Sequence, residues 1–376
     1  MTRLSADELA RRTLVRQFPV VSGVDDAAVL ELLDRLGPVQ SQVPRSPFLT
    51  AASRLPGVER STVRRLFEEH RLLKTSSLRG TVHTGVVAQY PGLDAVARRG
   101  RRGMVAAQLR LSRVTPEELL AELEAFAADA WRPRTEVVEH AGAWLAVHES
   151  AAVAASVTAS PVAALLWGHS GLLRRPPDQR WETRTDVLHR RARSVVPGLP
   201  EPTFAVALAG LVRVHLGAVG PATRADLAFF CGTTLGAVDT AVADLGEALV
   251  RLDGPDGETF VDLAEPGPEG PGPVGVRLLP EFDALLVGFH GRHRTRFLDA
   301  EQLVEVWAKA NGQFAPVVLR EGRLVATWRT VAVRSSVRVE VRPLSRCRAP
   351  DEAELAEPAA AAARALGADL ADVRVV

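Results

Sequence analysis

Apolar residues follow a helical spacing and then a strand-like alternation in the first part of the chain. The helical spacing covers four segments, at about residues 5–17, 25–37, 48–54 and 62–70. Ser5-Ala6-Asp7-Glu8 is a capping box for the first helix, and Gly37 ends the second. Residues 72–84 then become strand-like, with Gly80 at a bend. This region therefore predicts helices followed by a two-stranded wing.

The same order of elements recurs twice. The second copy has two helices and a hairpin, beginning at Arg134 and covering 161–173 and 172–188. The third copy has two helices and a wing, at about 220–231, 235–249 and 249–263. Gly232 breaks the pattern between the last two helices, as in a helix-turn-helix. We therefore expect a winged helix-turn-helix in the third copy, a fold that suggests DNA without proving chemistry.

The remainder of the chain mixes strands with short helices. Residues 264–273 are rich in Pro and Gly and predict a linker. Beyond it, helix, hairpin and strand patterns occur at about 300–310, 316–328, 331–341, 351–366 and 372–376. The expected fold is α+β, with three tandem winged helix-turn-helix units that form a concave surface and a C-terminal, mainly antiparallel β region. The expected domains are residues 1–110, 111–197, 198–273 and 274–376.

Composition describes a well-buried globular protein without a global charge. The chain has 376 residues, 47% of them apolar, and a formal net charge of +1. A DNA-binding surface would therefore require charge to be sorted onto one face. Arginines do cluster, at Arg98, Arg99, Arg101 and Arg102, at Arg190, Arg191 and Arg193, and at Arg292, Arg294 and Arg296. For each cluster taken singly, a solvated face is the more common explanation.

Cysteine and lysine usage limits the chemistry. Cys231 and Cys347 have no CxxC partner, which argues against a metal cage or a disulfide framework and fits a reducing cytoplasm. Lys74 and Lys309 are the two lysines, so few amines could form a Schiff base, and direct attack by water is favoured. We expect no signal peptide, membrane span, metal or cofactor.

Two glutamines stand two residues apart in a proline-stiffened connector, residues 37–47. In an extended segment alternate side chains face one way, so Gln40 and Gln42 would present both carboxamides to one point. Such a glutamine pair could hold a water without carrying charge. On spacing alone, two solvated glutamines in a loop is the more common explanation.

The neighbouring residues favour a site. The segments are Leu36-Gly37-Pro38-Val39-Gln40-Ser41-Gln42, Arg45-Ser46-Pro47-Phe48, Ser53-Arg54-Leu55-Pro56-Gly57 and Leu78-Arg79-Gly80-Thr81-Val82-His83-Thr84. Together they resemble the winged-helix DNA glycosylase family typified by AlkZ, the AlkZ/YcaQ superfamily, over nearly the whole chain. The resemblance implies a bacterial enzyme that excises bulky N7-alkylated purines and unhooks interstrand crosslinks, in self-resistance to a bis-alkylating natural product such as azinomycin B.

The resemblance also implies a role for the glutamine pair. Alkylation at N7 makes the departing base neutral, so a monofunctional enzyme has to place a water and stabilise positive charge on the sugar. Gln40 and Gln42 would flank that water through their carbonyl oxygens. Members that resemble YcaQ carry an acidic residue where this sequence has Gln42, so the sequence matches the form that acts on bulky, crosslink-like substrates.

Candidate DNA contacts come from basic residues in connectors and hairpins: Arg45, Arg79, His83, Arg292, Arg294, Arg320 and Arg323. Arg320-Glu321-Gly322-Arg323 has the shape and charge of a hairpin tip for the minor groove, and residues 290–294 predict a phosphate-facing turn. Ordinary exposed arginines, a structural histidine and an exposed turn explain the same residues without DNA.

Two functions fit these patterns. One is the DNA glycosylase, with a duplex that carries an alkylated purine or a crosslink as its partner. The alternative is a winged-helix transcription regulator or another non-catalytic DNA-binding protein. Regulators usually dimerise on palindromes, whereas three wings in one chain need no second copy, so we expect a monomer.

Overall fold

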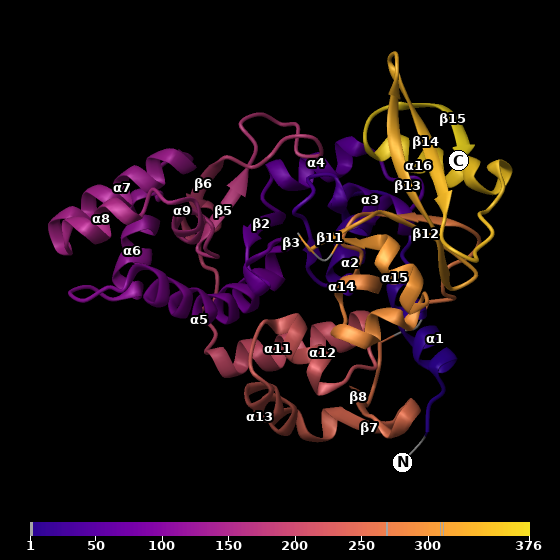
Figure 1. Ribbon diagram of the computed structural model, residues 1–376, viewed down its shortest axis with the longest axis horizontal. Helices are drawn as coiled ribbons and strands as arrows, with labels where there is room; N and C mark the ends of the chain where they lie inside the picture. The colour runs from indigo at the N-terminus through magenta and orange to yellow at the C-terminus, as the bar shows by residue number, and fades with distance from the viewer. Residues whose placement is uncertain (1–2, 268–269, 309, 311) are drawn as a thin grey trace.

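The structure is a mixed α+β fold. The computed structural model describes residues 3–267, 270–308, 310 and 312–376, without the side chains of Ser160, Asp256 and Arg292. The indigo N-terminal segment runs through the middle of the molecule, the magenta segment forms one end of the long axis, and the yellow C-terminal sheet lies at the other end (Figure 1).

Four helices and a hairpin form the first part of the chain, as the sequence predicts. The helices are α1 (Ala6–Gln17), α2 (Asp26–Leu36), α3 (Ser46–Arg54) and α4 (Arg60–Glu68), and the hairpin is β2 (Leu72–Ser76) with β3 (Val82–Val86). The side chain of Ser5 accepts from the Glu8 amide and caps α1, and Gly37 ends α2 at φ 73°. Leu32, Leu66 and other buried apolar side chains join α2, α3, α4 and the hairpin in one core cluster.

Strand β1 (Val39–Gln40) begins two residues after Gly37 and pairs with β3. Its register places Val39 opposite Thr84 and Gln40 opposite His83. The connector between the second and third helices is therefore an edge strand of a sheet, and its side chains have fixed directions.

A long helix that the sequence patterns did not reveal leads into the second part. It is α5 (Tyr90–Leu109), and it is followed by α6 (Pro116–Phe126), β4 (Arg132–Pro133), α7 (Arg134–His148), α8 (Ala151–Ser156), α9 (Ser160–Trp167), β5 (Leu172–Arg175), β6 (Leu188–Arg191) and α10 (Ala192–Val195). The helix expected at 161–173 is shorter than predicted. It ends before Gly168, where a Cβ would lie 2.5 Å from the Ala164 carbonyl oxygen.

The two hairpins share one sheet. Its strand order is β1-β3-β2-β5-β6-β4, and the hairpins meet where Thr75 pairs with Leu173. The Thr75 hydroxyl donates to the carbonyls of Ser170 and Leu172 at 3.1 and 2.9 Å. The first two predicted units are thus joined through the backbone of a six-stranded sheet, and the division of the chain into four domains stays a prediction.

The third part follows its predicted pattern after one unexpected helix. That helix is α11 (Phe204–Val219), and it precedes α12 (Arg224–Cys231), α13 (Leu235–Leu245), β7 (Leu249–Asp253) and β8 (Thr259–Leu263). Thr223 and Asp226 form a capping box at α12, and Gly232 ends this helix in the left-handed region at φ 65°. Helix α11 packs against α1, α2, α5, α12 and α13 and so connects the first part of the chain to the third.

The C-terminal region is a sheet covered by one helix. Its elements are β9 (Arg277–Leu279), α14 (Ala284–Val287), α15 (Ala300–Val306), β10 (Trp307–Ala308), β11 (Gln313–Phe314), β12 (Val317–Arg320), β13 (Arg323–Val333), β14 (Ser336–Pro343), α16 (Glu352–Ala365) and β15 (Asp369–Val375). The five-stranded order is β15-β14-β13-β12-β9, antiparallel except for the pair β14 and β15. The predicted mainly antiparallel region is confirmed.

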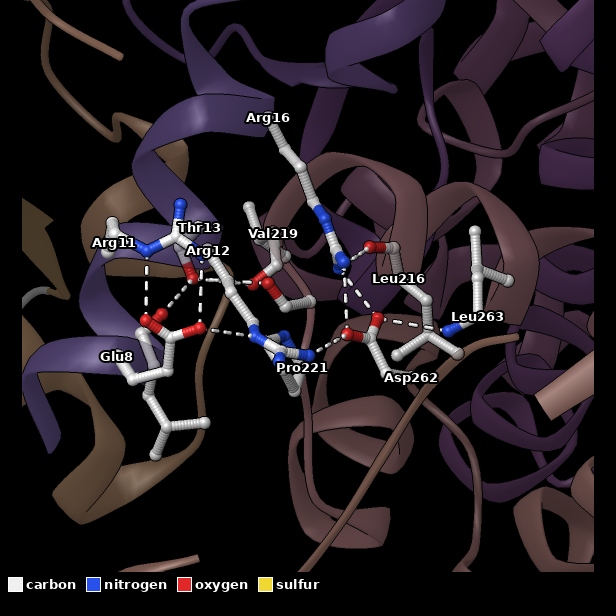
Figure 2. A network of polar contacts seen from close by, with 12 residues as sticks. Glu8, Arg11, Arg12, Thr13, Arg16, Leu216, Val219, Pro221, Asp262 and Leu263 are labelled. Atoms are coloured by element: carbon white, nitrogen blue, oxygen red, sulfur yellow. Dashed lines mark hydrogen bonds and ion pairs between the residues drawn. The ribbon is translucent and has the colours of Figure 1, made fainter. Parts of the chain in front are cut away.

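A buried ion pair joins α1 to the third part of the chain (Figure 2). The Arg16 guanidinium donates to both carboxylate oxygens of Asp262 in β8, at 2.6 and 2.9 Å, and to the carbonyl of Leu216 in α11 at 2.9 Å. The two charged side chains are 4% and 1% exposed. The Thr13 hydroxyl donates to the Val219 carbonyl at 2.9 Å. The N-terminal helix is therefore held by residues 200 or more positions away.

His293 joins the third part to the C-terminal region. It lies in a 3-10 turn, Gly291–Arg296, with Nδ1 2.9 Å from Asp226 and Nε2 2.8 Å from Glu258. Both ring nitrogens can donate only when the imidazole is protonated. Burial disfavours the charged form of the ring. The hydrogen bonds and negative charges of Asp226 and, to a smaller extent, Glu258 outweigh burial, so the pKa of His293 is raised.

The buried ion pair predicts a large stability effect. In Asp262→Asn the Arg16 charge stays buried without its counter-charge, and we expect a loss of about 3 kcal/mol or more in the free energy of unfolding. Urea denaturation followed by circular dichroism measures it. Asp239→Asn is the control, because Asp239 pairs with Arg224 at the surface, where both side chains are about half exposed. Equal losses in the two variants would contradict this assignment.

His293 predicts a pH-dependent stability. Its folded-state pKa lies above the unfolded value of about 6.5, so its contribution is fully present below about pH 6.5 and is lost as pH rises through the raised pKa. The urea midpoint of the wild type should therefore lie above that of His293→Gln, and this difference should be larger at acidic pH than at alkaline pH. His148→Gln, at an exposed histidine of α7, is the control. A gap between wild type and His293→Gln that widens with pH would contradict the assignment.

Candidate functional site

The glutamine pair lies at the edge of the six-stranded sheet. Pairing with β3 fixes the backbone of Gln40, and the Ser41 amide continues the ladder by donating to the Val82 carbonyl at 2.7 Å. The Ser41 side chain faces away from the pair and donates to the Thr84 hydroxyl at 2.9 Å. Gln40 is 7% exposed, whereas Gln42 is exposed. One carboxamide is therefore inside the fold and the other is at its surface.

The two carboxamides contact each other. Gln40 Nε2 donates to Gln42 Oε1 at 2.8 Å, and Arg79 Nη2 donates to Gln40 Oε1 at 3.0 Å. A guanidinium can only donate, so the oxygen of Gln40 must face Arg79 and its nitrogen must face Gln42. The alternation of side chains along an extended segment thus correctly predicts that the carboxamides lie on one side. Each carbonyl oxygen keeps a second lone pair that can accept from a water.

A narrow cavity lies behind Gln40. It has a volume of about 40 Å³, and its wall includes Gln40, Arg79, His83, His215 and the ion pair of Arg54 with Asp283. That ion pair is closed at 2.8 Å, and both side chains are 1% exposed. Most of the other lining residues are apolar, so the polar groups of this cavity lie on one part of its wall.

The two histidines of this cavity are neutral. Burial, with the charge of Arg79, lowers the pKa of His83 to about 3, and burial lowers the pKa of His215 to about 3. His83 Nδ1 lies 3.1 Å from the Ser77 hydroxyl, and the His215 ring packs on Phe230 with centroids 4.4 Å apart. A neutral imidazole with so low a pKa is a poor proton donor and acceptor at neutral pH. The site is therefore suited to positioning rather than to acid–base transfer.

Arg79 contributes to this site from inside the fold. Its Nη1 donates to the Phe230 carbonyl at 2.8 Å, and its guanidinium lies 4.9 Å from the Phe229 ring centroid. Burial lowers the pKa of Arg79 to about 10, so the side chain is still a cation at neutral pH. The sequence suggested a DNA contact for this residue, but its two terminal nitrogens bond to other parts of the chain.

Burial also contradicts two other expected DNA contacts. His83 is 2% exposed and Arg294 is 7% exposed, so neither presents its side chain to an outside duplex. Arg294 donates to the Phe289 carbonyl at 3.1 Å and packs on aromatic rings. The turn expected to face phosphate instead directs His293 toward two carboxylates. The Arg292 side chain lies outside the described residues.

The remaining three arginines have partners within the chain. Arg45 is paired with Glu281 and donates to the Thr330 hydroxyl at 3.0 Å. Arg320 is paired with Glu354 at 3.0 Å, and Arg323 with Asp299 at 2.8 Å. Arg323 is the most exposed of the three, with 49% of its side chain accessible.

The hairpin tip between β12 and β13 is packed on the fold. A Cβ at Gly322 would lie 3.2 Å from a methyl group of Leu14 in α1. The hairpin of β13 and β14 is the one that extends away from the body of the molecule (Figure 1), and Arg334 at its tip is exposed. Strand β13 is long because it joins the second half of the hairpin predicted at 316–328 to the first residues of the segment predicted at 331–341.

Two negative findings apply to the described residues. They contain no group of three His, Cys, Asp or Glu side chains that could hold a metal ion. No helix among them is both long enough and apolar enough to cross a membrane.

Comparisons with known proteins agree with the fold. The family model for AlkZ-like DNA glycosylases matches residues 33–365. The interstrand DNA cross-link repair glycosylase of Streptomyces sahachiroi is 27% identical over 314 residues, which cover 80% of this chain and 82% of that protein. The solved structure of DNA glycosylase AlkZ from the same organism gives a TM-score of 0.77 at 22% identity and covers both chains completely. Because the family model spans most of the sequence, this chain belongs to the AlkZ-like DNA glycosylase family.

Proposed function

We propose that this enzyme is a monofunctional glycosylase that hydrolyses the N-glycosidic bond of bulky N7-alkylpurines and unhooks DNA interstrand crosslinks. The printed name of the Streptomyces sahachiroi relative supports this substrate class. The observation that carries the proposal is the contact between Gln40 and Gln42, an uncharged pair with one member at the surface. A role in resistance to a bis-alkylating natural product belongs to the same proposal.

The chemistry of the lesion fits a site of neutral amides. An N7-alkylated purine leaves as a neutral base, so no general acid has to protonate it. Catalysis then depends on placing a water at the anomeric carbon and on stabilising the positive charge that develops on the sugar. Gln42, which is exposed, holds the water through the free lone pair of Oε1, and Gln40 holds Gln42.

The helix and hairpin segments supply a surface for the duplex. In this proposal they act as three tandem winged helix-turn-helix units that form a concave face. Two of the hairpins belong to one sheet, which would hold their relative positions when DNA binds. Arg323 is the predicted contact with the most exposed side chain. Arg320 and Arg45 are weaker candidates, because both are only partly exposed and are paired with Glu354 and Glu281. The enzyme acts as a monomer.

The alternative, a non-catalytic DNA-binding protein or regulator, is not favoured. Its support was the helix-turn-helix of residues 220–263, a fold that also occurs outside regulators. The family model covers that segment together with the glutamine pair and describes glycosylases.

The glutamine pair predicts a loss of rate without a loss of binding. We expect Gln40→Ala and Gln42→Ala each to lower the single-turnover excision rate by roughly 100-fold, as for the loss of one positioned polar group. The assay uses a duplex with one N7-alkylguanine and detects alkali-labile abasic sites, and fluorescence anisotropy measures duplex affinity. Gln108→Ala, at an exposed glutamine of α5, is the control. Wild-type excision by both site variants would refute the proposed mechanism.

A phosphate contact by Arg323 would contribute to the salt dependence of duplex binding. If it neutralises one phosphate, Arg323→Ala should reduce the slope of log affinity against log salt concentration by about 0.9. Arg374→Ala is a matched control, because Arg374 is 54% exposed and is also paired with an aspartate, Asp372. Identical slopes for the wild type and Arg323→Ala would remove Arg323 from the interface.

A further inference from the structure

We infer that Arg79 is a positioning residue that sets the orientation of the Gln40 and Gln42 carboxamides and so controls the rate of glycosidic bond cleavage. The inference rests on the proposed function, because it concerns the same site. It differs from the DNA contact that the sequence suggested for Arg79, since it places the effect in the chemical step rather than in duplex binding.

The first step is the polarity of the hydrogen bonds. A pair of amides that bond only to each other has two nearly equivalent arrangements, because either one can donate and the other accept. A guanidinium has donors and no acceptor, so Arg79 allows only the arrangement with Gln40 Oε1 turned toward it. Gln40 must then donate to Gln42, and the direction of the second carboxamide follows. The fixed guanidinium of Arg79 therefore determines the orientation of both carboxamides.

The second step is how Arg79 itself is held. It lies in the turn between β2 and β3 with φ 55°, in the left-handed region that non-glycine residues seldom adopt. Its other terminal nitrogen donates to the Phe230 carbonyl at 2.8 Å, and Phe229 lies beneath the guanidinium. Both contacts come from the C-terminal end of α12. The guanidinium is therefore fixed from two sides, by its own hairpin and by a helix of the third part.

The third step is the close approach of Gly232. A Cβ at this position would lie 3.0 Å from the Arg79 backbone nitrogen and 3.4 Å from its Cγ. Gly232 also has φ 65°, so it both ends α12 and leaves room for Arg79. The position of α12 is thus coupled to the glutamine pair through one side chain.

The fourth step concerns charge. A cation beside the deoxyribose would oppose the positive charge that develops there during cleavage. Arg79 avoids this because Gln40 separates it from the exposed Gln42. An amide that accepts from a cation becomes a better donor, so the bond from Gln40 to Gln42 is strengthened. The useful place for Arg79 is therefore behind the pair and away from the substrate.

A double-mutant cycle with Gln40 tests the inference. Arg79→Met keeps much of the side-chain length and removes the donors, and we expect its single-turnover rate at saturating duplex to fall by about tenfold with duplex affinity within twofold of wild type. In the Gln40→Ala background the same change should have almost no further effect on the rate, because the residue through which Arg79 acts is absent. Arg79→Lys should recover part of the rate.

Three outcomes would overturn the inference. The first is a rate loss in the double variant that equals the product of the losses in Arg79→Met and Gln40→Ala. The second is a loss in Arg79→Met that appears in duplex affinity and its salt dependence instead of the rate. The third is a wild-type rate for Arg79→Met. Wild-type rates for Gln40→Ala and Gln42→Ala would reject the proposed function itself, which is a separate result.

A second variant covers the case in which Arg79→Met does not fold. Gly232→Ala keeps the guanidinium and displaces it, so its rate should fall severalfold with unchanged duplex affinity, and Gly236→Ala in α13, where a Cβ meets nothing within 4 Å, is the matched control. Urea midpoints confirm that each variant is folded. Equal excision rates for Gly232→Ala and Gly236→Ala would also overturn the inference.

Discussion

The pairing of the short strand β1 with the edge of β3 is the contact on which the site depends. It fixes the Gln40 backbone opposite His83, shortly after the turn at Gly37 that ends α2. The turn of the same hairpin carries Arg79, which fixes the Gln40 side chain. Backbone and side-chain constraints therefore come from one hairpin, and that hairpin is itself anchored in a six-stranded sheet. An amide site without charge needs such support, because weak dipoles act only when they are already oriented.

Local signals predicted much of the fold, and long-range contacts explain what was missed. Capping residues such as Ser5 and helix-ending glycines such as Gly37 mark helix boundaries through residues close in sequence. The hairpins of the three predicted wings also follow from local patterns. Helix α11 was missed because it is apolar around most of its surface and lacks an amphipathic period. The union of two hairpins into one sheet depends on Thr75 and Leu173, which share no local pattern.

The same distinction applies to the site. Alternation in an extended segment was enough to predict that Gln40 and Gln42 lie on one side, since it depends on neighbouring residues. The environments of His83, Arg79 and Arg294 were not predictable, because a basic residue looks the same in sequence whether it faces water or a distant carbonyl. Arg79 meets Phe230 from 151 positions away, and only the folded chain shows that its nitrogens have partners.

The central claim is that neutral amides position the water and that no side chain of the site gains or loses a proton during cleavage. The most direct measurement is the single-turnover excision rate of N7-alkylguanine at saturating duplex, as a function of pH. With His83 and His215 titrating near pH 3, the account predicts a flat profile between about pH 6 and pH 8. A bell-shaped or sigmoidal profile in that range would show an essential acid or base and would contradict it.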